Sequence, residues 1–394
     1  MKNVITASEL KSRVRSGNAP KLGEIDAVTC GTFGVMSGTA AIFSFAAAAP
    51  GTFNRAETVY LNGVPATVGP CPNENNGFID CIVNGTSVSR NNRRYSGGHL
   101  FADMAAGKTI IIEVKTDNGI LTLSRNVRDF STARLIVTRG AFKNYTAFVN
   151  RSSEDVKSIF SVLPFSPLGA VATFSGCGEI NPLENDPTLR FHSPGTRVLV
   201  NGAPGVLLGC GTRSSPEHPN LSAAADIAEM DSDLMGGFSF ADSAECLTSI
   251  ATAIPLEDSA ALAAASVLDE DIALPVADVS DRIPFTSSTY SNAWAGDLRP
   301  VSHPENCTNT CKVCAAAVCP RSAITDERTI TSACMGCMTC TVVCLHNVFT
   351  GDAGALRAAD GSRYRITLRQ SDRIRGERAA LRLKELIVSG EWRG

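Results

Sequence analysis

The sequence predicts a mixed α/β protein of the α+β class, with a large body and a small cysteine-rich module near the C-terminus. Two observations predict this class. Helix and strand signals are about equally frequent over the first 300 residues, and eight of the 14 cysteines fall between residues 307 and 344. With 394 residues, the chain is long enough for two or three domains and a substantial core.

The elements of the body follow from local patterns. Thr6 and Glu9 form a T-x-x-E capping box, which predicts the start of a helix. The alanine-rich run 40–49 predicts a buried, closely packed helix that is too short to span a bilayer. Further strands are predicted at 109–114 and 133–137, and further helices at 152–161 and 223–230. Residues 280–306, rich in Ser, Pro and Asn, predict a linker into the cysteine-rich module.

Two segments of the body, 59–71 and 198–210, echo each other. In both, Asn-Gly follows an alternating apolar run, which predicts a β-hairpin because both residues tolerate positive φ. Upstream of them, Thr32-Phe33-Gly34 and Thr173-Phe174-Ser175 form a second echo. Duplication of one α/β unit and chance recurrence both remain open, since such hairpins are common.

The C-terminal segment predicts a strand and a closing helix. Residues 364–368 alternate like a strand, and Ser371 or Asp372 can cap the helix that Gly390 ends. The apolar face of this helix is expected to pack back on the body and carries Ile374, Leu383, Leu386 and Ile387. The expected division is therefore a body (1–300), a cysteine-rich module (303–350) and a returning segment (351–394).

Composition narrows the function classes. A net charge of −3 gives no electrostatic reason to expect nucleic acid or an anionic membrane as partner. The N-terminal segment lacks the apolar region of a signal peptide. A cytoplasmic, reducing location is expected, in which all 14 cysteines stay available as thiols or ligands.

The cysteine-rich module contains two runs of four cysteines. The second run, CMGCMTCTVVC, has the spacing C-x2-C-x2-C-x3-C, and the first run ends in Cys319-Pro320. Thiolates at such spacings turn inward onto one iron–sulfur cubane, and the fourth cysteine of each run ligates the other cluster. On that pattern, one 4Fe-4S cluster has the ligands Cys307, Cys311, Cys314 and Cys344, and the second has Cys334, Cys337, Cys340 and Cys319.

Residues 303–350 thus resemble a bacterial-type two-cluster ferredoxin domain, with two departures. The first run reads C-x3-C-x2-C-x4-C, and Leu345 rather than proline follows Cys344. The alternatives are zinc, which prefers four ligands in two CxxC pairs, and disulfides, which need an oxidising compartment. Eight interleaved cysteines fit an iron–sulfur module better than either alternative.

The body resembles the homocysteine-biosynthesis family, also called L-aspartate semialdehyde sulfurtransferases, over roughly residues 5–300. The segments that carry the resemblance are GTFGVMSGTA (31–40), YSGGHLFADMAAGK (95–108), GEINPLENDP (178–187), GTRVLVNGAPGVLLGCGTR (195–213), EHPNL (217–221), GGFSF (236–240) and DEDIALPVADV (269–279). With a fused ferredoxin-like module, the chain is most similar to the branch called methanogenesis marker 16, which occurs in methanogenic archaea.

The resemblance implies a reductive sulfur transfer. An aldehyde gains sulfur and two electrons and becomes a thiol, with a cysteine persulfide as sulfur carrier. The branch implies sulfoacetaldehyde as substrate and coenzyme M as product, and aspartate semialdehyde and homocysteine are the alternative. Two clusters carry one electron each, which matches the demand for two electrons. The expected partners are the aldehyde, a sulfide or persulfide donor, an external low-potential electron donor and a further copy of the chain.

The family does not transfer the sulfur-carrying cysteine to this chain. The homocysteine branch has a cysteine where this chain has Ser37, and a second near 121–125, where this chain reads LTLSR. A carrier thiol is expected to be partly exposed with a lowered pKa. Loop positions, flanking glycine or proline, and a nearby arginine favour four candidates, ranked Cys71, Cys177, then Cys30 and Cys210. Cys81 and Cys246 are expected to be buried small hydrophobes.

An anionic aldehyde also needs cationic and proton-donating groups. Arg197 and Arg213 each follow Gly-Thr in a glycine-rich region, where a guanidinium and backbone N–H groups can clamp an anion. His99 and His218 lie in loop-like contexts and can protonate a carbonyl oxygen. The alternatives are surface arginines and structural histidines.

Two other function classes stay open. One is a non-catalytic iron–sulfur electron-transfer subunit whose body docks a partner enzyme, and the other is a cluster-carrying assembly or regulatory protein. Neither class needs cysteines outside the ligand set, whereas this chain has six of them. The six cysteines favour the sulfurtransferase.

Overall fold

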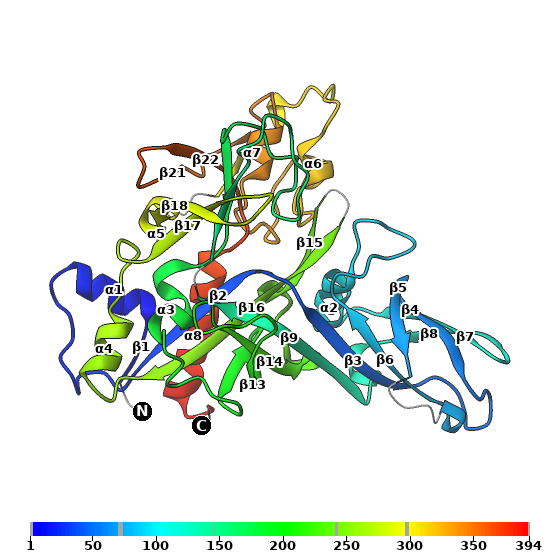
Figure 1. Cartoon of the computed structure of the whole chain (residues 1–394). Coiled ribbons are helices and arrows are strands. Elements are labelled where there is room, and N and C mark those ends of the chain that lie inside the picture. The colour runs from blue at the N-terminus through cyan, green and yellow to red at the C-terminus, as the bar shows by residue number, and fades with distance from the viewer. Residues whose placement is uncertain (1–2, 70–73, 144, 241–242, 296–298, 393–394) are drawn as a thin grey trace.

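Two β-sheets organise the computed structural model, which describes residues 3–69, 74–143, 145–240, 243–295 and 299–392. A 14-stranded sheet crosses the base of the molecule, and a six-stranded sheet stands above the half that contains β2 and β16 (Figure 1). In order, the large sheet contains β1 (Val4–Thr6), β2 (Ala27–Met36), β16 (Ala244–Pro255), β12 (Arg197–Val200), β13 (Ala203–Cys210), β14 (Asn220–Asp226), β9 (Thr132–Phe142), β3 (Thr39–Ala46), β6 (Phe78–Asn84), β5 (Val64–Val68), β4 (Ala56–Leu61), β7 (Ile110–Thr116) and β8 (Gly119–Arg125), with β15 (Gly236–Ser239) paired to β16.

The smaller sheet joins the C-terminal segment to the middle of the chain. It contains β18 (Pro284–Thr289), β17 (Ala273–Asp278), β10 (Ala147–Val149), β11 (Val171–Phe174), β22 (Arg363–Arg369) and β21 (Ala355–Arg357), and a separate pair is formed by β19 (Val301–Ser302) and β20 (Phe349–Thr350). The α-helices are α1 (Ala7–Arg15), α2 (Gly97–Ala105), α3 (Pro182–Asn185), α4 (Ser259–Ala265), α5 (Tyr290–Ala293), α6 (Ala315–Val318), α7 (Thr339–Val343) and α8 (Arg373–Ser389). Among the helices that the structure describes, none is long and apolar enough to cross a membrane.

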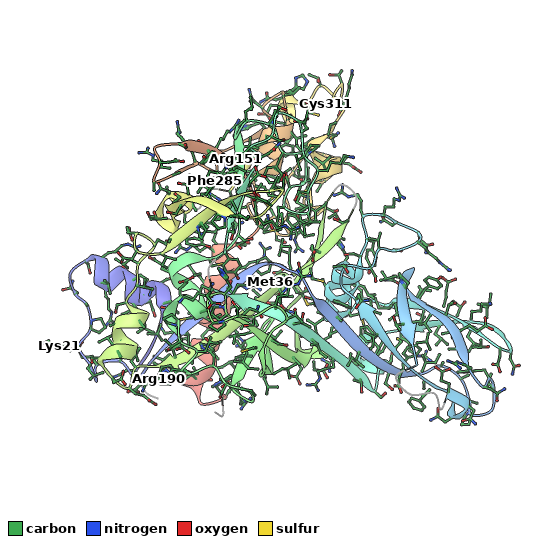
Figure 2. All side chains as sticks on the ribbon, viewed as in Figure 1. Lys21, Met36, Arg151, Arg190, Phe285 and Cys311 are labelled. Atoms are coloured by element: carbon green, nitrogen blue, oxygen red, sulfur yellow. The ribbon has the colours of Figure 1, made fainter. Side chains whose placement is uncertain are left out.

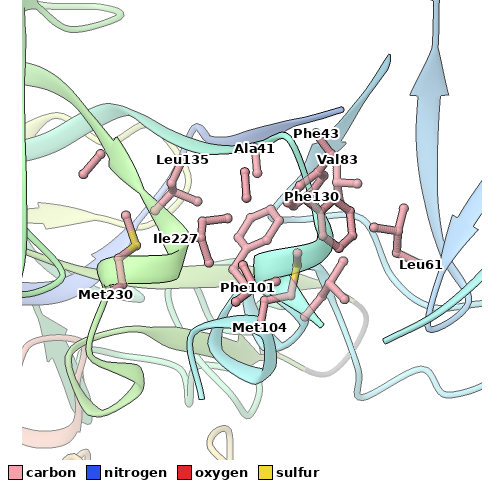
Figure 3. Close-up of a cluster of buried hydrophobic side chains, with 14 of the residues drawn as sticks. Ala41, Phe43, Leu61, Val83, Phe101, Met104, Phe130, Leu135, Ile227 and Met230 are labelled. Atoms are coloured by element: carbon pink, nitrogen blue, oxygen red, sulfur yellow. The ribbon is translucent and has the colours of Figure 1, made fainter. Parts of the chain in front are cut away.

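The largest hydrophobic core lies where α2 packs on the large sheet (Figure 3). The ring of Phe43 on β3 lies 6.2 Å from that of Phe101 on α2 and 5.4 Å from that of Phe130. Tilted aromatic pairs of this kind contribute about 0.5–1.5 kcal/mol each beyond the burial of their surface. This packing holds α2 in place and with it His99 in its first turn.

Strand β2 is buried along nearly its whole length because α8 packs against it. Two glycines allow the close approach, since a Cβ on Gly31 would lie 2.1 Å from the carbonyl oxygen of Gly376. As predicted, Asp372 caps α8 and Gly390 ends it in the left-handed conformation (φ 79°). The predicted apolar face is correct for Leu383 and Leu386 and wrong for Ile374, which is 46% exposed.

We expect Gly31→Ala to destabilise the body. The added methyl has no space between β2 and α8, and overpacking of a core typically costs about 1–3 kcal/mol. Denaturant unfolding of the variant measures the loss, and Leu381→Ala at an exposed position of α8 serves as control, with an expected change within about 0.5 kcal/mol. An unchanged unfolding midpoint in Gly31→Ala would mean that the two backbones are not in contact.

Three helix predictions are wrong in the described structure. The alanine-rich run forms β3, because Gly38 (φ 86°) turns the chain back from β2 and the residues of β3 are then alternately more and less buried. Residues 223–230 form most of β14 and a short 3-10 helix that Asp226 caps. Residues 152–161 form an irregular loop with one bridge, between Val156 and Phe165. Strand pairing overrides the helix propensity of alanine in the first two cases.

The remaining element predictions have mixed outcomes. The capping box of α1 is confirmed, as are strands at 109–114, 133–137 and 364–368, which fall in β7, β9 and β22. Both Asn-Gly pairs form the predicted hairpin turns, with positive φ at Asn62 and Asn201. The predicted linker 280–306 is not a simple linker, since it contains β18, α5 and β19.

The internal echo is confined to these two hairpins. Thr32-Phe33-Gly34 lies in β2 of the large sheet, whereas Thr173-Phe174 lies in β11 of the smaller sheet. The two upstream segments therefore have different neighbours, and the hairpins alone share their local geometry.

Candidate functional site

Four cysteines of the predicted second ligand set line one cavity. They are Cys319, which follows α6, Cys334 and Cys337 in the loop before α7, and Cys340 in α7. The other lining residues are apolar except for Arg321. Burial raises the pKa of Cys337 to about 12, and the neighbouring thiols of Cys319 and Cys334 contribute. The four thiols therefore form one group, although they come from two separate runs.

The donor set of this cavity fits a 4Fe-4S cluster. Zinc would need its four sulfurs in a tight tetrahedron at about 2.3 Å from one ion, whereas a cubane takes thiolates that stand around a larger group. In the described ranges, no three His, Cys, Asp or Glu side chains converge closely enough to hold a single metal ion. Four thiols around an otherwise apolar cavity suit the larger group.

The predicted first ligand set lies at the far end of the module. Cys307 and Cys344 pack beside Phe349, and the Arg328 guanidinium lowers the pKa of Cys307. Cys314 lies near the same guanidinium. Cys311 is exposed and stands at the upper tip of the molecule in Figure 2, far from Met36 in the large sheet. The first set is thus closer to solvent than the second.

Arg321 docks the second cavity onto the large sheet. Its guanidinium donates hydrogen bonds to the carbonyl oxygens of Gly237 (3.2 Å) and Met235 (3.4 Å) at β15, and to that of Ala333 (3.2 Å) in the module. The N–H of Ser239 donates to the carbonyl oxygen of Pro320 at 2.9 Å. Burial lowers the pKa of Arg321 to about 10. Because a buried cation is costly without partners, these contacts fix the module firmly on the body.

A second buried arginine joins the cavity to α8. Arg375 donates to the carbonyl oxygen of Cys334 (2.8 Å) and to the carboxylate of Asp372 (2.5 Å). Arg299 donates to the other oxygen of the same carboxylate at 2.6 Å. In addition, the N–H of Arg369 donates to the carbonyl oxygen of Cys337 at 3.1 Å. The end of β22 and the start of α8 therefore run along the cavity wall.

Cys177 lies at the other side of this segment, in the Gly176-Cys177-Gly178 turn after β11. Its thiol is 3.5 Å from the carbonyl oxygen of Phe33 and 3.9 Å from that of Asp372. The flanking glycines are required, because both have positive φ and a Cβ on Gly178 would lie 2.1 Å from the carboxylate of Asp269. Asp372 thus connects the thiol to the arginines of the cavity wall.

Cys177 is fully buried, and polar side chains lie near its thiol. Burial raises the pKa of its thiol to about 11, and the Arg373 guanidinium opposes this rise. The side chains of Thr32 and Tyr145 are buried near the thiol, and the Thr32 hydroxyl also opposes the rise in the pKa of the thiol. Arg373 also lines an open surface groove with Arg15 and Glu179, and its guanidinium forms an ion pair with Asp269 at 2.7 Å.

The other candidate thiols occupy different settings. Cys30 was expected to be accessible, but it is fully buried in β2, and burial raises its pKa to about 12 against the opposing charge of Lys11. Cys81 and Cys246 are buried, as expected. Cys210 is exposed at the end of β13. Cys71, the first-ranked candidate, lies outside the described residues.

The structure gives the four predicted substrate residues separate surroundings. Arg197 stacks on the ring of Trp392 at 4.7 Å, and Arg213 lies beside Arg139 of β9. His218 is exposed in a loop. His99 is buried at the start of α2, its Nδ1 accepts from the N–H of Ser96 (3.1 Å), and burial and the charge of Arg321 lower its pKa to about 4. His99 is therefore neutral at physiological pH and cannot act as a cationic donor.

Several polar residues near these sites have no signal in the sequence. His192 pairs with Asp186 at 2.6 Å in the core, close to the predicted Cys30. Arg321, Arg375, Arg139 and Glu245 also occur outside any recognisable spacing. Arg321, Arg375 and Glu245 contact segments distant in sequence that only the fold brings together, whereas His192 and Asp186 are six residues apart.

Comparison with known proteins identifies the family. The family model described as homocysteine biosynthesis enzyme, sulfur-incorporation, matches residues 2–393. An uncharacterized protein of Methanothermobacter thermautotrophicus is 44% identical over 99% of this chain and 90% of its own length. An L-aspartate semialdehyde sulfurtransferase of Methanosarcina acetivorans is 29% identical over 75% of this chain and 60% of its own length. No solved structure matches.

The described chain has a mixed α/β fold, and its sequence matches a family of sulfur-incorporating enzymes. The chain belongs to the homocysteine-biosynthesis sulfurtransferase family, whose model covers almost its full length.

Proposed function

We propose that this protein is a reductive sulfurtransferase that converts an anionic aldehyde to a thiol with electrons from two 4Fe-4S clusters. The observation that carries the proposal is the position of the second cysteine cavity, directly against the family's body and close to Cys177. Arg369, which contacts Cys337, is only three residues from Asp372, which contacts Cys177. Three residues of extended chain span roughly 10 Å.

The atoms and electrons of the reaction balance as follows. One aldehyde, one sulfide, two electrons and two protons give one thiol and one water. The outer sulfur of a persulfide is two electrons more oxidised, so its release as sulfide takes two further electrons and two protons. The clusters, when bound, supply these electrons one at a time. When each of the two clusters is reduced once, their two electrons suffice for the route from sulfide. When each is reduced twice in succession, their four electrons suffice for the route from the persulfide.

The residues of the chain have distinct roles in this scheme. Cys319, Cys334, Cys337 and Cys340 would hold the cluster near the body. Cys307, Cys311, Cys314 and Cys344 would hold the outer cluster, on the side from which an external low-potential donor would supply electrons. Cys177 carries the sulfur, and the Arg373 guanidinium stabilises its negative charge. The Thr32 and Tyr145 hydroxyls are donors available to the outer sulfur.

The substrate assignment rests on relatives. Sulfoacetaldehyde, which gives coenzyme M, is the proposed substrate in a cytoplasmic, reducing compartment, and aspartate semialdehyde, which gives homocysteine, is the second candidate. Relatives of 29% and 26% identity are named for the second reaction. The much higher identity to an uncharacterized methanogen protein, 44%, favours a separate activity for this branch. A homo-oligomer stays a prediction from the sequence.

Anaerobic reconstitution tests the proposal directly. The protein is loaded with iron and sulfide, reduced with a low-potential chemical donor, and given each aldehyde with a persulfide donor or, in a parallel reaction, with sulfide, while the thiol product is measured by mass spectrometry. We expect about eight irons per chain and turnover of sulfoacetaldehyde. A protein that binds no iron, or that binds iron and turns over neither aldehyde, contradicts the proposal. Loaded protein that only reduces a partner enzyme would be an electron-transfer subunit.

Removal of one buried cation is expected to change the potential of one cluster. Arg299, Arg321 and Arg375 surround the second cavity, and positive charge stabilises the reduced, more negative cluster. Arg321→Met should lower its reduction potential by on the order of 50 mV, which is about 1 kcal/mol for one electron. A redox titration followed by electron paramagnetic resonance measures this shift. Arg378→Met, at a half-exposed position of α8, is the control and should leave both potentials unchanged.

A further inference from the structure

A polar cluster outside the thiol region lies where four segments of the large sheet meet. These segments are the β2–β3 turn with Ser37 and Gly38, the middle of β9 with Thr138 and Arg139, the segment after β13 with Thr212 and Arg213, and the start of β16 with Glu245. The Thr138 hydroxyl donates to the carbonyl oxygen of Gly38 at 2.8 Å and lies 3.4 Å from the Thr212 hydroxyl. The N–H of Thr212 donates to the carbonyl oxygen of Thr138 at 3.0 Å. Arg139 and Arg213 directly follow these two threonines, and the charge of Arg213 acts on Arg139.

The guanidinium groups of Arg139 and Arg213 have unused donors. Neither forms an ion pair or a hydrogen bond with another residue in the part of the chain that the structure describes. Arg139 is half-buried, with its guanidinium 5.3 Å from the ring centre of Phe142. Burial lowers the pKa of Arg139, and the charge of Arg213 lowers it further. Two neighbouring cations with free forked donors repel each other until an anion binds between them.

Glu245 provides a proton-donating group at the same place. Its Oε1 accepts from the Ser37 hydroxyl at 3.2 Å, and its Oε2 is buried with no hydrogen-bond partner among the described residues. Burial raises the pKa of this carboxyl, against the effect of Arg139. A protonated Glu245 can donate to a carbonyl oxygen, whereas an ionised one would repel a bound anion.

We propose that Arg139 and Arg213 clamp the anionic group of a short aldehyde, a sulfonate or a carboxylate, and that Glu245 donates to its carbonyl oxygen. The identity of the aldehyde rests on the proposed function, whereas the clamp itself does not. Packed side chains connect the clamp to Cys177 and to the inner cysteine cavity. The ring of Phe142 lies 5.5 Å from that of Tyr145, which borders Cys177, and Glu245 pairs across β15–β16 with Phe238, which packs near Cys337.

Direct binding of unreactive anions tests the clamp without any turnover. 2-Hydroxyethanesulfonate and glycolate are titrated by calorimetry into the full, cluster-loaded protein, which compares a sulfonate with a carboxylate. Arg139→Met and Arg213→Met should each weaken binding of the preferred anion about 10–100-fold, as expected for a lost charge-assisted contact. Arg134→Met, at an exposed position of the same strand, is the matched control and should bind like the parent protein.

Two further variants separate charge from folding. Arg139→Lys keeps the charge but loses the planar fork, so it should fold normally and still bind several-fold more weakly. Glu245→Gln replaces the protonated carboxyl with another neutral group and should bind the anion at least as tightly as the parent protein. Parent-like affinity in both methionine variants, or weaker binding in Glu245→Gln, would overturn the clamp. Normal anion binding by a protein that converts no aldehyde would leave the clamp standing and disprove the proposed reaction.

Discussion

Cys337→Ala is expected to remove one of the two clusters and to abolish thiol formation. Cys337 lies in the wall of the second cavity, 8% exposed, with three other thiols around the same space. Loss of one of four thiolate ligands leaves an iron without protein ligation in a cavity that is otherwise apolar. Iron and acid-labile sulfide should fall by about half, and one set of electron paramagnetic resonance signals should disappear.

The outer cysteines supply the control for this experiment. Cys311→Ala changes an exposed residue at the tip of the module, so it should affect the outer cluster and leave the second one intact. With a strong chemical reductant that reaches the second cluster directly, Cys311→Ala should keep part of its activity, whereas Cys337→Ala should keep none. Full iron content in Cys337→Ala, or equal activities in the two variants, would contradict the assignment of the inner cavity as the site that feeds the body.

The sequence predicted the members of the inner cysteine group but not their surroundings. The spacing of Cys334, Cys337 and Cys340, with Cys319 from the other run, groups four thiols that line one cavity, and their role as cluster ligands stays a prediction. Local spacing is informative here because three of the four residues lie within one short loop and helix. Arg321 and Arg375 contact the same region from the end of the first run and from α8, and no spacing rule connects them.

The same contrast between local and distant contacts explains the errors in the fold. Hairpins and caps were predicted correctly because they depend on residues close in sequence. Asn62-Gly63 forms the turn of one hairpin, and Thr6 and Glu9 form the capping box of α1. The alanine-rich runs were assigned to helices because alanine has the highest helix propensity, yet both became central strands between long-range partners. Alanine fits there because closely packed neighbours cover those strands, which a single sequence does not reveal.

The sequence favoured an accessible thiol as sulfur carrier, but Cys30 is fully buried. In this protein, exposure is therefore not the feature by which a sulfur carrier is recognised. Partial exposure and a lowered pKa describe a thiol that reacts with molecules from solvent. Cys177 is instead buried with a raised pKa of about 11. A buried carrier protects a persulfide from water and stray oxidants, and it becomes reactive when its neighbours supply positive charge and hydrogen-bond donors. Arg373, Thr32 and Tyr145 are such neighbours.

Cys177→Ala is therefore expected to lower aldehyde-dependent thiol formation by at least about a thousandfold, as for removal of a nucleophile that acts as part of a unit. Iron content and both cluster signals should be unchanged, because Cys177 contacts the carbonyl oxygens of Phe33 and Asp372 and no cysteine of the module. Steady-state turnover gives the loss. Mass spectrometry of the parent protein after incubation with a persulfide donor should show one added sulfur on the peptide that contains Cys177.

Cys81→Ala is the matched control, since this thiol is equally buried but lies on β6 of the large sheet, whereas Cys177 follows β11 of the smaller sheet. It should keep its activity apart from a loss of stability of about 1 kcal/mol from the small cavity left behind. If Cys177→Ala retains activity and added sulfur is found on Cys210 or Cys71 instead, another thiol carries the sulfur. The route from the inner cysteine cavity would then run through Phe238 toward Glu245 rather than through Asp372.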